Sequence, residues 1–160
     1  MYKIRDLSIP SNSRIIVISD IHGELELFKK LLENVSYNEE DYLIINGDLC
    51  EKGSNSKGVV KYIMTLSANN RNVHVTEGNC DTIVEDLLNE NPKLIKYLIT
   101  RKKSLLNEWL EDLGIYINEE TKVQYIKEEL IHNFSEEIKW LTELPTAIET
   151  EDYIFLFMLV

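Results

Sequence analysis

Three short polar clusters follow three apolar segments of the chain, and their side chains are of kinds that bind metal ions. Asp20 and His22 flank a single residue, so in an extended loop both side chains leave the same side and can meet one cation. Asp48 follows a glycine and offers two carboxylate oxygens, enough to bridge two ions, and Asn79 adds a neutral amide oxygen. Carboxylate, imidazole and amide ligands together suit Mn, Fe or Zn better than Ca or a cysteine-bound structural zinc.

Two such ions, about 3.5–4 Å apart, activate a water molecule and neutralise a phosphoryl group in one arrangement. The ligand types therefore favour metal-dependent hydrolysis of a phosphoester. Each residue taken singly is also common in turns and helix caps. Their order along the chain, each cluster with its own glycine, is what favours a metal site.

The segments before the clusters are typical of buried strands in a parallel sheet. Residues 14–19 and 42–46 are apolar runs without alternation, as expected of strands buried on both faces, and residues 72–76 are a third strand. Helical spacing of apolar residues follows each cluster, over residues 25–35, 59–66 and 83–88. This alternation predicts parallel βαβ units, whose ligands bind at the carboxyl ends of the strands, so the three clusters should converge.

The second part of the chain has a helical pattern. We predict a helical insertion over residues 92–144, within a single domain of residues 1–160. One long helical pattern covers residues 94–113, and two shorter helices are predicted over residues 121–130 and 135–145. A β-hairpin is then predicted from residues 146–149 and 153–157. The fold class is therefore α/β.

Three sequence blocks resemble the signature blocks of the calcineurin-like metallophosphoesterases, in the same order and at similar spacing. They are Ser-Asp-Ile-His-Gly at 19–23, Gly-Asp-Leu-Cys-Glu-Lys-Gly-Ser-Asn-Ser at 47–56, and Gly-Asn-Cys-Asp at 78–81. The second block is most similar to the serine/threonine phosphoprotein phosphatase pattern Gly-Asp-x-x-Asp-Arg-Gly-x-x-Ser. The resemblance implies the α/β sandwich of that superfamily and two divalent metal ions. By this resemblance, Asp20 and His22 are ligands of the first metal, Asp48 is the bridging ligand and Asn79 is a ligand of the second.

The second and third blocks depart from the family pattern at positions expected to bind or act on phosphate. Glu51-Lys52 stands where the family has Asp-Arg, so a forked phosphate clamp becomes a single point charge. Cys80 stands where the family usually has a catalytic histidine, and a thiol cannot act as a charged imidazolium. Cysteine at this place also occurs in some phosphodiesterase-like members, which leaves a phosphodiester substrate open. The resemblance suggests Asp48, Glu51, Cys80 and Asp81 as catalytic residues, and Lys52 and Asn79 as ligands of the substrate phosphate.

The sequence finishes where the family carries a further metal-binding motif, His-Ala-Gly or His-Gly-Gly. Residues 156–160 read Leu-Phe-Met-Leu-Val instead, so we expect an incomplete second metal site and a second sheet that is largely missing. One codon choice for residues 155–160 encodes Phe-Phe-Ile-His-Ala-Gly when a single T is added to its T run. The hypothesis is that a one-base deletion truncated a longer phosphatase.

Composition narrows the class of partner. A formal net charge of -11 would repel a nucleic-acid backbone, so no nucleic-acid partner is expected. No apolar run approaches the roughly 20 residues that cross a bilayer, so no membrane partner is expected either. Residues 1–14 also lack the charged-then-apolar pattern of a secretory signal, so the expected location is cytoplasmic. Two cysteines are too few for a disulfide framework and suggest a reducing compartment.

The leading interpretation is a metal-dependent phosphomonoesterase of the phosphoprotein phosphatase type, acting on a phosphoprotein or a small phosphoester. A phosphodiesterase is one alternative. Another is a catalytically inactive truncated fragment that keeps a weak metal site from Asp20, His22 and Asp48. A flavodoxin-like binding domain without metal would explain the alternating strands and leave the three blocks as coincidence.

Overall fold

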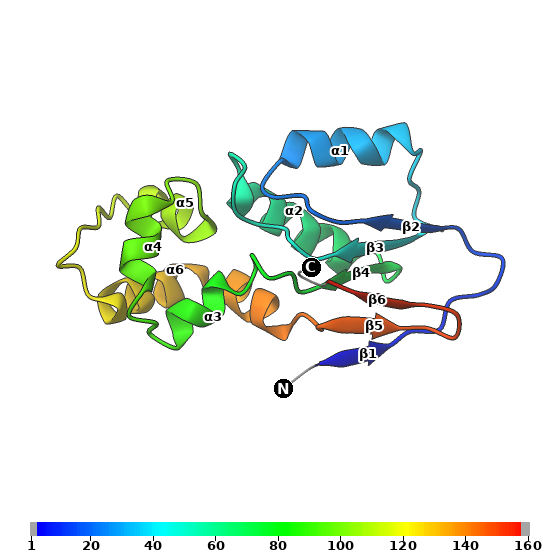
Figure 1. Cartoon of the computed structure of the whole chain (residues 1–160). Helices are drawn as coiled ribbons and strands as arrows, with labels where there is room; N and C mark the ends of the chain where they lie inside the picture. Colours follow the sequence, from blue (N-terminus) through cyan, green and yellow to red (C-terminus); the bar gives the residue numbers. More distant parts are fainter. Residues whose placement is uncertain (1–2, 158–160) are drawn as a thin grey trace.

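Three parallel strands, each followed by a helix, form the first sheet, as the sequence predicts. The computed structural model describes residues 3–157. The strands, in spatial order, are β2 (Ile15–Ile18), β3 (Tyr42–Asn46) and β4 (Val73–Thr76). The helices that follow them are α1 (Leu25–Asn34), α2 (Ser56–Asn69) and α3 (Ile83–Leu88). Helices α1 and α2 lie on one face of this sheet (Figure 1).

The central strand β3 is buried on both faces, whereas β2 is not. Leu43, Ile44 and Ile45 of β3 have no exposed surface, but Val17 of β2 is 50% exposed. The prediction that residues 14–19 form a strand buried on both faces is therefore wrong. The reason is position: β2 lies at the edge of the sheet and pairs only with β3.

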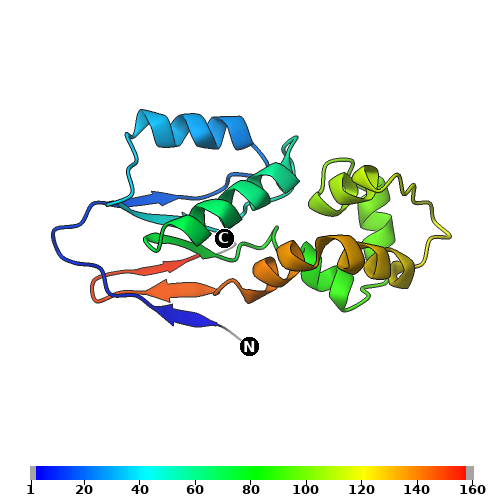
Figure 2. The ribbon, with the colours of Figure 1, turned by 180° about the vertical axis from the view of Figure 1, so that it is seen from behind.

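A second, smaller sheet lies beside the first (Figure 2). Its strands, in spatial order, are β1 (Ile4–Asp6), β5 (Ala147–Glu149) and β6 (Ile154–Leu156). Strands β5 and β6 form the predicted antiparallel hairpin, and Asn46 Nδ2 of β3 donates a hydrogen bond of 3.1 Å to the carbonyl of Leu156. Strand β1 pairs in parallel with β5 and was not predicted, because its three residues are all exposed and show no apolar pattern. Met158–Val160, on which the frameshift hypothesis depends, lie outside the described residues.

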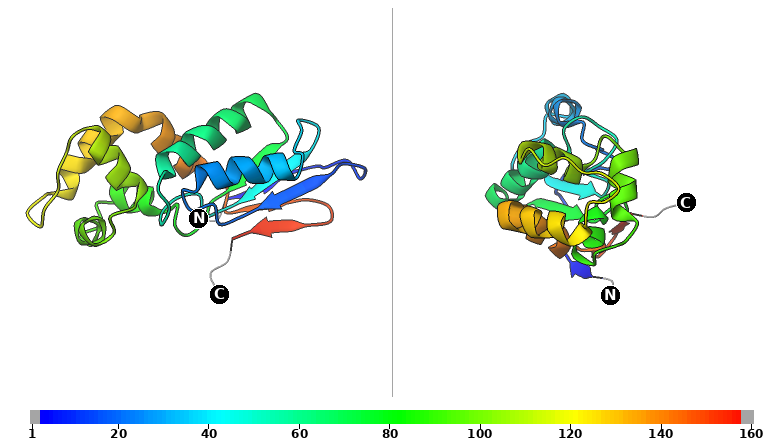
Figure 3. Two further views of the ribbon diagram at one scale, coloured as in Figure 1. Left: turned by 90° about the horizontal axis from the view of Figure 1, so that it is seen from above. Right: turned by 90° about the vertical axis from the view of Figure 1, so that its left-hand side faces the viewer.

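The remaining helices gather beyond the carboxyl ends of the first sheet (Figures 1 and 3). They are α4 (Leu94–Thr100), α5 (Leu105–Asp112) and α6 (Val123–Glu143). The predicted single helix over residues 94–113 is broken, because the hydroxyl of Ser104 accepts from Asn107 N and starts α5 anew. Helix α6 is kinked at Phe134, between the two helices that the sequence predicts there. None of the helices within residues 3–157 combines the length and apolar character needed to span a bilayer.

An ion pair at the opposite end of the sheet joins the residues that immediately precede β2 and β3. Arg14 Nε and Nη2 donate to the two carboxylate oxygens of Asp41, at 2.8 and 2.6 Å. The guanidinium also donates to the carbonyls of Val35 and Ser36 after α1. The hydrogen bond from Arg14 lowers the pKa of Asp41 below its ordinary value.

We expect Asp41→Asn to lower the melting temperature by a few degrees at pH 7, because it removes the charge that the guanidinium pairs with. A carboxyl group with a lowered folded pKa stabilises the protein above its unfolded pKa of about 4, and this stabilisation is lost as pH falls. The difference in melting temperature between wild type and variant should therefore close below about pH 4. A difference that stayed constant from pH 7 to pH 3 would contradict this account.

Candidate metal centre

Strained backbone is concentrated in the loops that follow β2 and β3. Within residues 3–157, seven non-glycine residues have positive φ, and five of these lie in the two loops. Such conformations cost on the order of 1–3 kcal/mol each, persist only where the surroundings hold them, and cluster at functional sites. The five are Asp20, His22, Asp48, Glu51 and Lys52.

The same two loops are hydrogen-bonded side by side. His22 N donates to Asp48 O at 2.9 Å, and Gly23 N donates to Leu49 O at 2.8 Å. The approach is so close at Gly53 that a Cβ atom there would overlap the carbonyl oxygen of His22. Glycine at this position is therefore required for the loops to meet, and their contact fixes His22 relative to Asp48.

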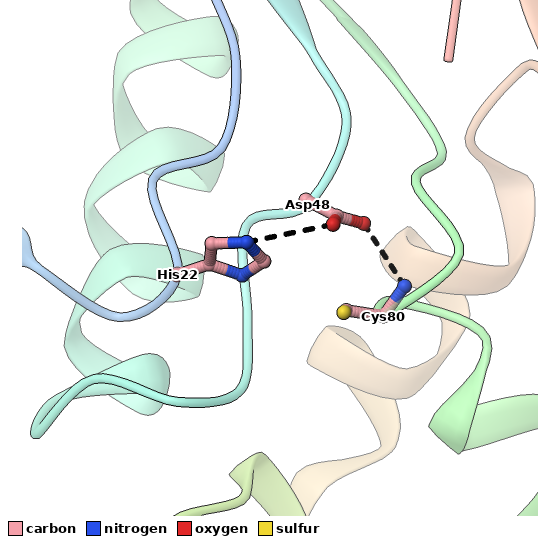
Figure 4. A group of neighbouring side chains, drawn as sticks. All are labelled: His22, Asp48 and Cys80. Atoms are coloured by element: carbon pink, nitrogen blue, oxygen red, sulfur yellow. Dashed lines mark hydrogen bonds and ion pairs between the residues drawn. The ribbon is translucent and has the colours of Figure 1, made fainter. Parts of the chain in front are cut away.

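The side chains of Asp20, His22, Asp48 and Cys80 converge at the carboxyl edge of the first sheet. His22 Nε2 lies 3.6 Å from Asp20 Oδ1 and 3.6 Å from Asp48 Oδ2. Cys80 N donates to Asp48 Oδ1 at 3.0 Å, which holds the carboxylate from the other side (Figure 4). Ligand atoms of His22, Asp48 and Cys80 all lie within 4.8 Å of one another. The structure thus brings together residues from all three predicted clusters.

The imidazole of His22 is oriented for ligation. Its Nδ1 lies 3.1 Å from the carbonyl of Cys50, and because a carbonyl only accepts, Nδ1 carries the proton. In the tautomer with its proton on Nδ1, His22 presents a lone pair at Nε2, toward the two carboxylates. The ammonium of Lys52 lies 3.0 Å from this nitrogen. A lone pair and two carboxylates gathered in this way fit a divalent cation with mixed nitrogen and oxygen ligands.

Cys80 and Asn79 lie beside this cluster. Burial, and then the neighbouring Asp48 carboxylate, raise the pKa of the Cys80 thiol to about 12, so among these protein groups it is a neutral thiol at pH 7. The Asn79 amide is exposed, with Nδ2 3.6 Å from Cys80 Sγ. Their expected roles, as general acid and as metal and phosphate ligand, remain predictions.

Glu51 and Asp81, two of the expected catalytic residues, have buried carboxylates that are already bonded. The Asp81 carboxylate accepts from the backbone nitrogens of Leu49, Cys50 and Gly78, and burial raises its pKa to about 6. It therefore braces the loop after β3 against the loop after β4. We propose that Asp81 positions Asp48 and its neighbours and that it does not touch the substrate.

The Glu51 carboxylate is one of two acidic groups that link the segment between β3 and α2 to helix α5 by hydrogen bonds to backbone nitrogens. Glu51 accepts from Leu105 N, in the first turn of α5, at 2.9 Å and from the Tyr97 hydroxyl at 2.8 Å. Glu108 of α5 in turn accepts from Ser56 N and Lys57 N, in the first turn of α2, at 2.8 Å each. Each acidic group thus satisfies backbone donors at the start of a helix from the other segment. We propose a positioning role for Glu51, which the motif alone did not indicate.

The comparison with protein families agrees with this geometry. The calcineurin-like phosphoesterase family matches residues 13–157, so this chain belongs to that family of metallophosphoesterases. The family is generally dependent on divalent metal ions.

Within its sequence, the chain is similar to curated proteins that share one name. The symmetrical bis(5'-nucleosyl)-tetraphosphatase of Buchnera aphidicola subsp. Schizaphis graminum (strain Sg) is 33% identical over 117 residues, which are 68% of this chain and 42% of that protein. The enzyme of the same name from Buchnera aphidicola subsp. Acyrthosiphon pisum (strain Tuc7) is 48% identical over 65 residues, which are 40% of this chain and 23% of that protein. The chain thus spans less than half the length of these relatives.

A crystal structure provisionally assigned as a diadenosine tetraphosphatase shares the fold. It aligns with a TM-score of 0.59 at 21% sequence identity, over 98% of this chain and 54% of that one.

Proposed function

We propose that this chain carries the metal-binding loops of a divalent-metal-dependent phosphoester hydrolase. The observation that carries the proposal is the convergence of Asp20, His22 and Asp48, with Nε2 to carboxylate distances of 3.6 Å, in a member of the calcineurin-like phosphoesterase family. We assign Asp20, His22, Asp48 and Asn79 to two ions of Mn, Fe or Zn. These ions would supply the positive charge that neutralises a phosphoryl group and favours ionisation of the attacking water.

The chain's own groups complete the site. Lys52, held in a left-handed conformation with its ammonium at the cluster, is placed to donate to a phosphate oxygen. Cys80 N holds Asp48 Oδ1, so the other carboxylate oxygen, Oδ2, faces His22 and is free to bind a cation. Asp81 ties the loop after β3 to the loop after β4, and Glu51 ties the loop after β3 to helix α5.

For the substrate we propose a small phosphoester with two nucleoside groups, a dinucleoside polyphosphate. The support is the name of the relatives, symmetrical bis(5'-nucleosyl)-tetraphosphatase. This class agrees with the phosphodiesterase alternative of the sequence analysis. A second candidate is a phosphoprotein substrate, which the similarity of residues 47–56 to the phosphoprotein phosphatase pattern favours.

One assay separates these candidates. The purified chain is incubated with diadenosine tetraphosphate, p-nitrophenyl phosphate or a phosphoserine peptide, with Mn²⁺ or with EDTA. We expect Mn²⁺ to increase release of ADP from the dinucleotide by at least about 100-fold over EDTA, because the ions carry most of the charge stabilisation. Turnover of the peptide in preference to the dinucleotide would favour the second candidate. Mn²⁺ binding without turnover of any substrate would contradict the proposal and support the inactive fragment.

A further inference from the structure

A cavity of about 260 Å³ adjoins the metal cluster on the side of the helical segment. It is lined by residues of the loop after β3, the loop after β4, helix α3 and the end of α4. In that order they are Glu51 and Lys52; Asn79, Cys80 and Thr82; Ile83 and Asp86; and Tyr97 and Arg101. We refer to it as the Lys52–Arg101 cavity.

Two cations line this cavity in a chain whose formal net charge is -11. Among residues 3–157, neither Lys52 nor Arg101 has a carboxylate within ion-pair distance. The carboxylates on the wall are engaged elsewhere: Glu51 accepts from Leu105 N and Tyr97, and Asp86 accepts from Asn91 Nδ2 at 2.7 Å. Arg101 is therefore available to a bound anion. The ammonium of Lys52 lies 3.0 Å from His22 Nε2 and keeps further N–H groups that can donate to an anion.

Arg101 is exposed, and its guanidinium lies over an aromatic ring in a contact that leaves its donors open. Its Cζ lies 5.8 Å from the centre of the Tyr97 ring, and the hydroxyl of Tyr97 is anchored on the buried carboxylate of Glu51. A cation over an aromatic face keeps its N–H groups at the edge, where a planar fork can bind phosphate oxygens. Glu51 thus positions Arg101 through Tyr97.

The Lys52–Arg101 cavity is continuous with the metal cluster. Lys52 lines the cavity while its ammonium lies 3.0 Å from His22 Nε2, and Cys80 lines it while its backbone holds Asp48. The volume is below the roughly 300–1,000 Å³ of pockets that enclose drug-sized ligands, so it suits a short anionic group better than a whole nucleotide.

We propose that the Lys52–Arg101 cavity binds the phosphate next to the reacting one in a polyphosphate chain, and that Arg101 is its main ligand. The inference rests on the proposed function, because it names how that site would distinguish a polyphosphate from a simple phosphate. Arg101 would bring a planar guanidinium from the helical segment to the same cavity as the ammonium of Lys52.

The test is calorimetric binding of inorganic pyrophosphate and orthophosphate in EDTA at low ionic strength. We expect the wild type to bind pyrophosphate at least about tenfold more tightly than orthophosphate. Arg101→Gln should weaken pyrophosphate binding about tenfold and orthophosphate binding less than twofold. The pyrophosphate affinity of Arg101→Lys should lie between those of the wild type and Arg101→Gln. Lys103→Gln is the matched control, because Lys103 is exposed and in the same interhelical segment. It should bind both anions like the wild type.

The proposal is overturned if the wild type does not bind pyrophosphate more tightly than orthophosphate, or if the pyrophosphate affinity of Arg101→Gln is within twofold of that of the wild type. It is also overturned if Lys103→Gln loses as much pyrophosphate affinity as Arg101→Gln. Because these measurements need neither Mn²⁺ nor turnover, they stand even if the chain hydrolyses no phosphoester, an outcome that would remove only the proposed function. With an active protein, Arg101→Gln should also lower kcat/KM for diadenosine tetraphosphate about tenfold while leaving that for p-nitrophenyl phosphate within twofold.

Discussion

Replacing Asp48 with asparagine is expected to lower kcat/KM for phosphoester hydrolysis by about 10³-fold or more and to weaken Mn²⁺ binding with it. Asp48 Oδ2 lies 3.6 Å from His22 Nε2, at the centre of the ligand cluster. The substitution removes the negative charge and, with Oδ1 kept toward Cys80 N, places an amide NH₂, which binds no cation, at the Oδ2 position. A metal ion contributes several kcal/mol to stabilising transition-state charge, and each 1.36 kcal/mol is tenfold in rate.

This substitution should not lower the stability of the fold, so a loss of activity in Asp48→Asn can be attributed to the metal site. The amide oxygen of asparagine can still accept from Cys80 N, the hydrogen bond that Asp48 Oδ1 accepts at 3.0 Å. The metal-free variant should therefore melt at or above the temperature of the wild type. Asp152→Asn is the matched control, since it removes one carboxylate from the exposed turn between β5 and β6. Equal Mn²⁺ affinity and equal activity in Asp48→Asn and Asp152→Asn would end the assignment of Asp48 as a ligand.

Local pattern was sufficient to predict the parallel units and the meeting of the polar clusters. Apolar runs, helical spacing and a polar cluster after each strand are local signals, and parallel strands place their carboxyl ends at one edge. The structure accordingly brings Asp20, His22, Asp48 and Cys80 together. The assignment of these residues as ligands or catalysts is still a prediction.

Features set by non-local contacts were not predictable from pattern. The direction of the Glu51 carboxylate depends on Leu105 N, which belongs to a helix more than fifty residues further along the chain. Arg101 sits near the cluster only because α4 packs beyond the carboxyl edge of the sheet. A faint signal existed, since Arg101, Lys102 and Lys103 are three consecutive cations in an acidic chain. Charge alone, however, does not reveal which of the three lines a cavity.

Replacing Gly78 with alanine is expected to reduce the free energy of unfolding by about 3 kcal/mol, the upper part of the overpacking range, and the melting temperature by roughly 6–12 °C. A Cβ atom at this position would overlap Asp48 N and Oδ1 and would lie 2.8 Å from Asp48 Cα. The neighbours are backbone and a braced carboxylate, which cannot rotate away. The loops after β3 and β4 would have to separate, and Mn²⁺ affinity should fall with stability.

Gly114→Ala separates the effect of the clash from that of any glycine substitution. Gly114 has a φ of +67° and nothing within 4 Å of an added Cβ, so alanine there costs only about 1 kcal/mol of backbone strain. Chemical denaturation measures the loss of unfolding free energy in each variant, and Mn²⁺ titration measures the loss of metal affinity. If Gly78→Ala unfolded at the same denaturant concentration as Gly114→Ala and bound Mn²⁺ as tightly, the contact between the two loops would not be what positions Asp48. The metal centre depends on that contact, because Gly78 N also donates to the Asp81 carboxylate that ties the loops together.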